Sequence, residues 1–123
     1  MTSNFLTVDE VIAIHDDLII QFGGPPGLRD MGALESAVLR PQMGYYDGVI
    51  GEAAALMESL AMNHPFVDGN KRVCLVAMEL FLLLNGHELS VGDAQCLETI
   101  LALADGSLAE DALAEWLRAH IAP

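Results

Sequence analysis

The stretch "NHPFVDGNKRVCLVAMELFLLLNG", residues 63–86, decides which fold to expect. From about residue 71 to residue 84 it carries apolar side chains on nearly every face of a helix, and Glu79 is the single charge after Arg72. Gly86 follows and is typical of the left-handed residue that ends a helix. We therefore predict a helix over residues 71–84 that lies buried at the centre of the protein.

The segments on either side also favour helices. Thr7 and Glu10 in "TVDE" have the spacing of a capping box, and apolar residues then recur at helical spacing up to the glycine- and proline-rich "GGPPG". Ser107 and Glu110 have the spacing of a second capping box. Further helices are expected at about residues 31–39, 52–62, 93–104 and 108–120. Only "HELS" could form a scrap of strand, so we predict an all-α fold of about six helices.

Composition limits the class of protein. The chain has 123 residues, of which 53% are hydrophobic, and this fits a single domain over residues 1–123. A net charge of −13 argues against direct nucleic-acid binding and against an anionic membrane surface, and suits a basic partner. There is no secretory signal pattern and no apolar run that could span a bilayer. Cys74 and Cys96 form no motif and are typical of buried thiols in a reducing compartment, so a cytoplasmic location is expected.

The loop before the central helix is placed to bind an anion. A helix N-terminus presents unpaired N–H groups and the positive end of the helix dipole, and phosphate is its usual guest. Gly69 lets the backbone approach such a guest closely. Lys71, the only lysine, and Arg72 place two of the five basic side chains at the same point. Cations are unfavourable in a first helical turn, so their position here indicates a function.

The same loop holds a candidate base and a candidate metal ligand. His64 is of the residue type that most often takes a proton from a hydroxyl in enzymes. A lone carboxylate such as Asp68 suits Mg²⁺ beside a polyphosphate. Pro65 stiffens the loop, and Phe66 is expected to anchor it in the core. Together these residues suit the transfer of a phosphorus-containing group to a hydroxyl.

Two simpler interpretations of the loop stay open at this point. His64 and Pro65 could form only a turn, with Asp68 or Asn70 as the cap of the next helix. His64 and Asp68 could also suggest a zinc pair, although the sequence places no third ligand beside them.

The loop resembles the signature of the Fic/Doc family, H-P-F-x-[DE]-G-N-G-R-x-x-R. The residues that match it at the same spacing are His64, Pro65, Phe66, Asp68, Gly69, Asn70 and Arg72. Lys71 stands in place of the second glycine and Leu75 in place of the last arginine. Both departures are typical of the Doc branch, the death-on-curing toxins of toxin–antitoxin modules. Residues 14–42 and "ELFLLLNGHEL" are also similar to Doc-type proteins, so the resemblance covers nearly the whole chain.

The resemblance implies the Fic fold, a compact helical bundle around the central helix. It also implies an ATP-dependent protein kinase that phosphorylates a threonine of elongation factor Tu and so arrests protein synthesis. The residues that it implies for the nucleotide are Phe66, Gly69, Asn70, Lys71 and Arg72, with His64 as general base and Asp68 as the ligand of Mg²⁺.

A partner is implied as well, a small antitoxin whose C-terminal segment binds in a groove on the toxin. No inhibitory [ST]-x-x-x-E-[GN] motif is found in this sequence, so inhibition by a separate chain is expected. Two alternatives stay open: an AMP transferase as in Fic proteins, against which Leu75 counts, and a catalytically silent module that only binds the antitoxin.

A few residues outside the loop have no settled role in the sequence. His15 is expected on the face of the first helix, with a place near the active site as the minority interpretation. Arg29 could pair with Asp30, or Asp30 could cap the following helix. Tyr45 and Tyr46 could form a flap over the site or pack on the core.

Overall fold

The computed structural model describes residues 3–122, which form six α-helices and a short 3-10 helix, η1. The elements are α1 Val8–Phe22, α2 Met31–Leu39, η1 Arg40–Gln42, α3 Gly48–Asn63, α4 Asn70–Leu84, α5 Asp93–Ala104 and α6 Glu110–His120. No strand occurs in this range, where "HELS" contributes only a single bridge between Leu89 and Ile121. The all-α prediction is confirmed. None of these helices is both long and apolar enough to cross a membrane.

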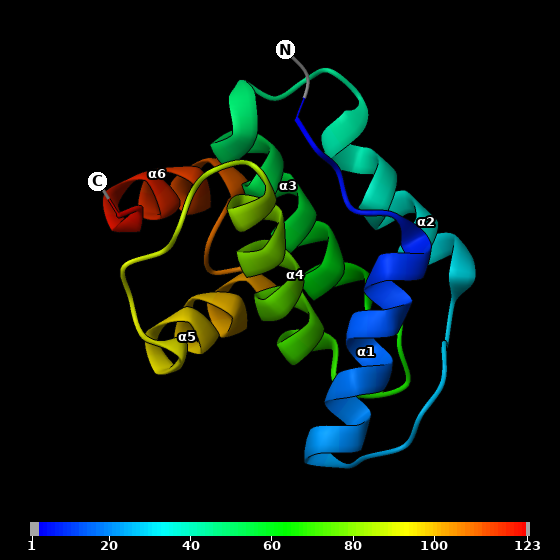
Figure 1. The fold of residues 1–123 in the computed structure, drawn as a ribbon. Coiled ribbons are helices and arrows are strands. Elements are labelled where there is room, and N and C mark those ends of the chain that lie inside the picture. The colour runs from blue at the N-terminus through cyan, green and yellow to red at the C-terminus, as the bar shows by residue number, and fades with distance from the viewer. Residues whose placement is uncertain (1–2, 123) are drawn as a thin grey trace.

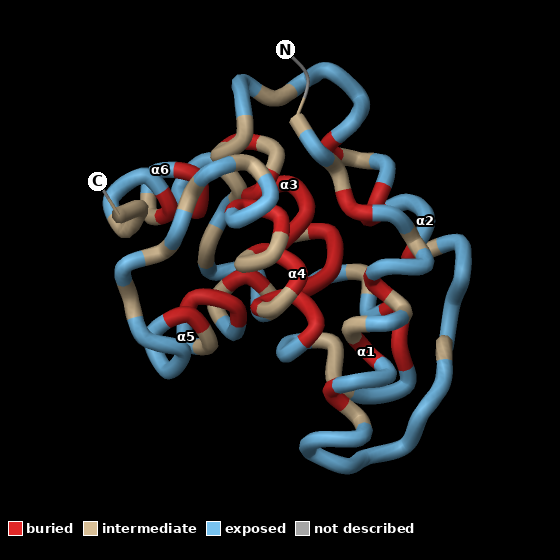
Figure 2. The backbone as a smooth tube through the Cα atoms, in the orientation of Figure 1, coloured by how far each residue is buried: buried red, intermediate tan, exposed pale blue. Residues whose placement is uncertain are grey.

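The centre of the bundle is shared by α4, as predicted, and by α3. The α3 helix packs against α2, η1, α4, α5 and α6, while α1 lies on α4 beside α2 (Figure 1). Figure 2 shows that buried residues are concentrated in α3 and in the adjoining part of α4. Three consecutive alanines of α3, Ala53, Ala54 and Ala55, are fully buried, so neighbouring helices can approach it closely. Leu83 and Leu84 at the end of α4 are exposed. The prediction that α4 is buried therefore does not hold for its last residues, although they are apolar.

Several helix ends lie where the sequence predicts them. The capping box of α1 is present: Thr7 Oγ1 accepts from the backbone N–H of Glu10 at 3.1 Å, and the Glu10 carboxylate accepts from the Thr7 N–H at 2.9 Å. Asp30 caps α2 by accepting from the backbone N–H of Ala33 at 3.0 Å. Gly86 has a φ of +85°, as expected after α4. The α3 helix begins at Gly48, earlier than the predicted start near residue 52.

The prediction of a second capping box, at Ser107 and Glu110, is wrong. The α6 helix begins at Glu110, its N-cap is Ala109, and no side chain caps it. Ser107 Oγ donates to the carbonyl of Ala102 at 3.2 Å instead. The Glu110 carboxylate pairs with Arg40, and this tertiary contact replaces the local one.

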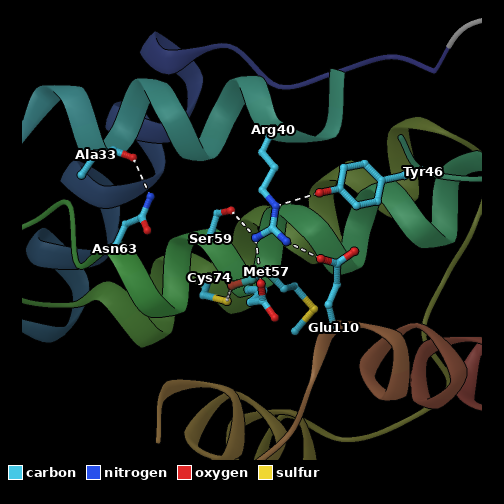
Figure 3. A network of polar contacts seen from close by, with 9 residues as sticks. Ala33, Arg40, Tyr46, Met57, Ser59, Asn63, Cys74 and Glu110 are labelled. Atoms are coloured by element: carbon cyan, nitrogen blue, oxygen red, sulfur yellow. Dashed lines mark hydrogen bonds and ion pairs between the residues drawn. The ribbon is translucent and has the colours of Figure 1, made fainter. Parts of the chain in front are cut away.

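Arg40 ties η1 to α3 and α6 through a polar network (Figure 3). Its guanidinium donates to the hydroxyl of Tyr46 at 2.8 Å, to Glu58 Oε1 at 2.8 Å and to Ser59 Oγ at 2.9 Å, and it also binds Glu110. The two carboxylates on one guanidinium make this a partly buried ion-pair network that stabilises the packing of three elements.

Both cysteines are buried, as predicted. Burial raises the pKa of Cys74 to about 12, and its Sγ donates to the carbonyl of Met57 at 3.3 Å. Cys74 is therefore a structural thiol and not a nucleophile.

The segment that connects α1 and α2, residues 23–30, runs along the outside of the molecule (Figure 1). It meets the loop between α3 and α4 in a short antiparallel contact. Leu28 forms a bridge with Phe66, and the backbone N–H of Val67 donates to the carbonyl of Gly27 at 3.1 Å. The motif loop is therefore held by a segment far away in the sequence.

Candidate active site

A cavity of about 340 Å³ opens between the end of α1, the motif loop and the first turn of α4. Its lining residues are Leu18, Ile19, Phe22, Gly23, His64, Val67, Asp68, Gly69, Asn70, Lys71 and Arg72. The polar side chains all come from residues 64–72, and α1 supplies an apolar wall. The candidate base, carboxylate and cations are therefore gathered in one place.

The first turn of α4 is open to an anion. The helix begins at Asn70 after Gly69, whose φ of +80° is a conformation that glycine adopts without strain. No side chain caps the helix, and its first turn contains no acidic residue. The N–H groups of this turn therefore lack helical partners and add to the positive end of the dipole. An anion bound here would also meet the exposed side chains of Lys71 and Arg72.

The basic side chains at the cavity form no direct ion pair with a carboxylate in the described part of the chain. Within residues 3–122, the ion pairs involve Arg40, with two glutamates, and Arg118, with Glu115. The other three cations, Arg29, Lys71 and Arg72, form no ion pair in that range, although the chain has a net charge of −13. All three lie in or next to the cavity.

Arg72 connects the cavity with a neighbouring groove. Its guanidinium carbon lies 3.7 Å from the ring centroid of Phe22, a close cation–π contact. Phe22, Arg72 and Leu18 also line a groove of about 240 Å³ between α1, α4 and α5. The remaining residues of this groove are Leu75, Val76, Glu79, Asp93 and Leu97. Burial, and after it the charge of Asp93, raises the pKa of Glu79 above its ordinary value.

Asp68 is exposed at the cavity, and its carboxylate is oriented from two sides. Oδ1 accepts from the backbone N–H of Gly69 at 2.8 Å. Gly24 lies so close that a β-carbon there would be 2.8 Å from Oδ2. Mg²⁺ commonly takes one or two protein carboxylates and completes its shell with phosphate oxygens and water, so a single Asp68 fits that ion beside a polyphosphate. Across residues 3–122, no three His, Cys, Asp or Glu side chains are grouped as a metal site of their own.

His64 follows α3 in a left-handed conformation, with φ +46° and ψ +59°. It is the one non-glycine residue with a positive φ in the described part of the chain, and such a conformation costs about 1–2 kcal/mol. Arg29 Nε donates to the carbonyl of His64 at 2.7 Å, and Arg29 Nη2 donates to that of Asn63 at 2.8 Å. The carbonyl of Pro65 accepts from the backbone N–H groups of Arg29, at 2.8 Å, and Asp30, at 3.0 Å. Three successive carbonyls are thus held by residues 29 and 30.

The second half of the loop is held from the core. The Asn70 side chain accepts from the backbone N–H of Phe66 and donates to its carbonyl, both at 2.9 Å. His15 is buried, and its Nε2 lies 2.8 Å from the carbonyl of Asp68. Since a carbonyl oxygen only accepts, Nε2 of His15 carries a proton. The His15 ring also stacks on Phe66, with centroids 3.9 Å apart. The loop is therefore preorganised along its whole length.

Comparison with known proteins identifies the family. The model of the Fic/DOC family matches residues 5–82, which include α1, the motif loop and most of α4. The chain belongs to the Fic/DOC family. A curated relative, "Toxin Doc" of Mycolicibacterium smegmatis, is 46% identical over 76 residues, which is 58% of this chain and 58% of the relative. "Protein kinase doc" of Escherichia phage P1 is 30% identical over 117 residues, which is 92% of each chain.

The structure corrects the assignment of one Fic/DOC motif residue. The resemblance implies that Phe66 binds the nucleotide, whereas its apolar side chain was also expected to anchor the loop; it is 2% exposed and does not line the cavity, which agrees with the second expectation. Its part in the site is to anchor the loop, as its stacking on His15 shows. Asn70 does line the cavity, yet its amide is engaged with Phe66, so its backbone N–H is the group left for an anion. Leu75, where the signature has arginine, lines the neighbouring groove.

Two residues that shape this Fic/DOC site were not assigned to it from sequence. His15 was expected mainly on a helix face, and the structure favours the minority interpretation, a place near the site, because its ring binds the loop 53 positions further along the chain. Arg29 binds carbonyls and not Asp30, which instead caps α2. Neither contact has a local sequence signal, because a backbone carbonyl is the same at every position.

The tyrosine loop does not cover the cavity. The hydroxyl of Tyr46 accepts from Arg40, and Tyr45 is 81% exposed; neither lines the cavity. The tyrosines precede α3 and His64 follows it, and 16 residues at about 1.5 Å each separate the ends of that helix by roughly 24 Å. Packing on the bundle, rather than a flap, is therefore the correct interpretation of Tyr46.

Proposed function

We propose that this chain is the toxin of a toxin–antitoxin module and an ATP-dependent protein kinase. Its target would be a threonine hydroxyl of a translation factor such as elongation factor Tu, so that protein synthesis in the cytoplasm is arrested. The observation that carries the proposal is the convergence of His64, Asp68 and the uncapped N-terminus of α4 on one cavity. Membership of the Fic/DOC family and the names of the two relatives agree with it.

Each side chain has a distinct part in the proposed reaction. The N-terminus of α4, with Lys71 and Arg72, would bind the phosphate oxygens of ATP. Asp68 would hold Mg²⁺, which when bound helps to neutralise the charge of the phosphates. His64 would take the proton of the target hydroxyl as its oxygen forms a bond to the γ-phosphorus. The bond from that phosphorus to the β–γ bridging oxygen breaks, and ADP leaves.

An AMP transferase is the second candidate, because the motif shares most of its residues with the signature of Fic enzymes. Two observations favour the kinase. Leu75 is 5% exposed and lines the groove rather than the cavity, so it supplies no phosphate clamp there. Lys71 adds an exposed side chain to the cavity where the signature has glycine. Both changes would alter how the triphosphate lies, and so which phosphorus faces the hydroxyl.

The test is a transfer assay with two labels. The purified chain is incubated with elongation factor Tu, Mg²⁺ and ATP labelled at either the γ- or the α-phosphate, with His64→Ala as the inactive control. We expect label on the protein target from γ-labelled ATP alone and none with His64→Ala. Label from α-labelled ATP would establish AMP transfer instead. Equal growth arrest in bacteria by the wild type and by His64→Ala would contradict catalysis by this site.

The neighbouring groove supports an antitoxin as the partner. Its wall is mainly apolar, and Glu79 and Asp93 give it a negative side, which suits a basic amphipathic segment. A segment bound there would also touch Arg72, because that side chain lines the cavity as well. We expect Leu97→Glu to weaken neutralisation by the cognate antitoxin and to leave the toxicity of the free chain unchanged. A silent docking module would show no toxicity in either form.

A further inference from the structure

We infer that Arg29 is a positioning residue for His64: its guanidinium holds the two carbonyls on either side of the turn that aims His64 into the cavity. The inference rests on the proposed function, because it assigns a role within the same site. The side chain of Arg29 does not itself line the cavity, so it acts through His64.

The contact suits the problem that this turn presents. The last carbonyls of a helix have no intrahelical partner, and the left-handed residue that follows a helix is usually glycine. Here that residue is His64, whose side chain is needed for the chemistry but whose conformation is unfavourable. The planar fork of Arg29 spans the carbonyls of Asn63 and His64 with bonds of 2.8 and 2.7 Å. A cation at the C-terminal end of α3 also complements the helix dipole.

The side chain of Arg29 can be changed without undoing the rest of the contact. The carbonyl of Pro65 is held by the backbone N–H groups of residues 29 and 30, and Leu28 forms a backbone bridge with Phe66. These bonds do not depend on which side chain stands at position 29. Arg29 is exposed, so its truncation opens no cavity in the core. Truncation of Arg29 therefore removes only the hydrogen bonds to the carbonyls of Asn63 and His64.

The phosphate-binding half of the site is held independently of Arg29. Asn70 fixes both backbone groups of Phe66, and His15 holds the carbonyl of Asp68. Removal of the Arg29 fork should therefore disturb the base and leave the anion site in place. Kinetically, kcat should fall while KM for ATP stays nearly constant.

The experiment compares three purified variants of the full chain. Arg29→Met keeps the apolar stem and removes every donor, and Arg29→Lys keeps the charge and one donor group. Arg118→Met is the matched control, because it makes the same change of net charge at an exposed site on α6. The measurements are kcat and KM for ATP in the transfer assay, the melting temperature, and the φ angle of His64 from the coupling of its amide and α protons by NMR.

We expect Arg29→Met to lower kcat by about 10- to 100-fold, with KM for ATP changed by less than about twofold. His64 should lose its positive φ in this variant, and Arg29→Lys should recover part of both properties. Arg118→Met should match the wild type. Arg29→Lys also keeps the test valid if Arg29→Met does not fold.

An Arg29→Met protein with wild-type kcat and a positive φ at His64 would overturn the inference. An equal loss of kcat in Arg118→Met would do so too, since it would trace the effect to net charge. If the wild type transfers neither label, the proposed function fails, and the NMR measurement still decides the inference. In that case, loss of the positive φ in Arg29→Met supports it and retention overturns it.

Discussion

Arg29 and Arg40 both join separate elements of the bundle, but their partners differ in charge. Arg40 binds the carboxylates of Glu58 and Glu110, so its charge is neutralised. Arg29 donates from Nε and Nη2 to two backbone carbonyls, which carry no net charge and so leave its own charge in place. Arg40 therefore stabilises the packing of helices, and Arg29 adds a net positive charge beside the cavity.

The difference shows where this acidic protein keeps its positive charge. Of the five basic residues, Arg40 and Arg118 are paired with glutamates, and Arg118 forms only an exposed pair of the kind that contributes little. Arg29, Lys71 and Arg72 have no carboxylate partner within residues 3–122. The location of unpaired cations, and not their number, therefore marks the site.

The largest expected effect on stability is that of Arg40→Met. It would leave Glu58 and Glu110 as two partly buried carboxylates without their cation, and we expect the free energy of unfolding to fall by about 2–3 kcal/mol. Urea denaturation measures this. Arg29→Met should cost less than about 1 kcal/mol, because its exposed carbonyl partners can turn to water. If both variants lost the same free energy of unfolding, the distinction between a charge-neutralised Arg40 and a carbonyl-bound Arg29 would be contradicted.

A smaller effect, on activity, is expected from Gly24→Ala. The new β-carbon would meet Oδ2 of Asp68 at 2.8 Å, so the carboxylate must move. We expect kcat to fall about tenfold, which corresponds to about 1.4 kcal/mol, with a higher requirement for Mg²⁺. Gly23→Ala is the control, because it also has a positive φ but no atom within 4 Å of a new β-carbon. A similar loss of activity in both variants would point to backbone strain and away from Asp68.

The unpaired cations should make the protein bind polyphosphate. Tripolyphosphate at a few times its Kd should stabilise the wild type by about 1 kcal/mol and raise Tm by a few degrees. The double variant Lys71→Gln, Arg72→Gln should lose this gain, whereas Arg118→Gln should keep it. The gain should shrink at high salt, because the cations are exposed. Thermal melts with and without the anion test this; an undiminished shift in the double variant would place the anion elsewhere.

The smallest effect concerns Glu79, a partly buried carboxylate that, unlike Glu58 and Glu110, has no arginine partner within residues 3–122. Burial and Asp93 raise its pKa above 4.5, so the folded state binds this proton more tightly than the unfolded chain does. Its ionisation therefore opposes folding as the pH rises through the raised pKa.

Glu79→Gln should accordingly raise Tm slightly at neutral pH, and the gain should vanish as the pH falls below the ordinary value of 4.5. Melting curves across this range decide the point, with the exposed Glu98→Gln as control. A gain that persists unchanged in acid would rule out ionisation of Glu79 as its cause.

The sequence by itself determined the helical class and the chemistry of the motif. The capping box at Thr7 and the cap at Asp30 act within one turn of the chain, so local pattern was enough to place them. His64, Asp68 and Lys71 could be expected to share a cavity because they stand close together in the sequence, in a short loop that leads straight into a helix. The start of α3 was less predictable, since Gly48 has no side chain to mark it.

Only the tertiary structure decided which residues hold that motif in shape. Arg29 reaches carbonyls 34 and 35 positions away, and His15 reaches one 53 positions away. Glu110 has the spacing of a local cap, yet it binds Arg40, because a guanidinium from another element offers a stronger, charge-assisted contact. Local patterns report interactions within a few residues. The contacts of Arg29 and His15 join distant segments through backbone carbonyls, which every residue has, so no sequence pattern marks them and they exist only once the chain has folded.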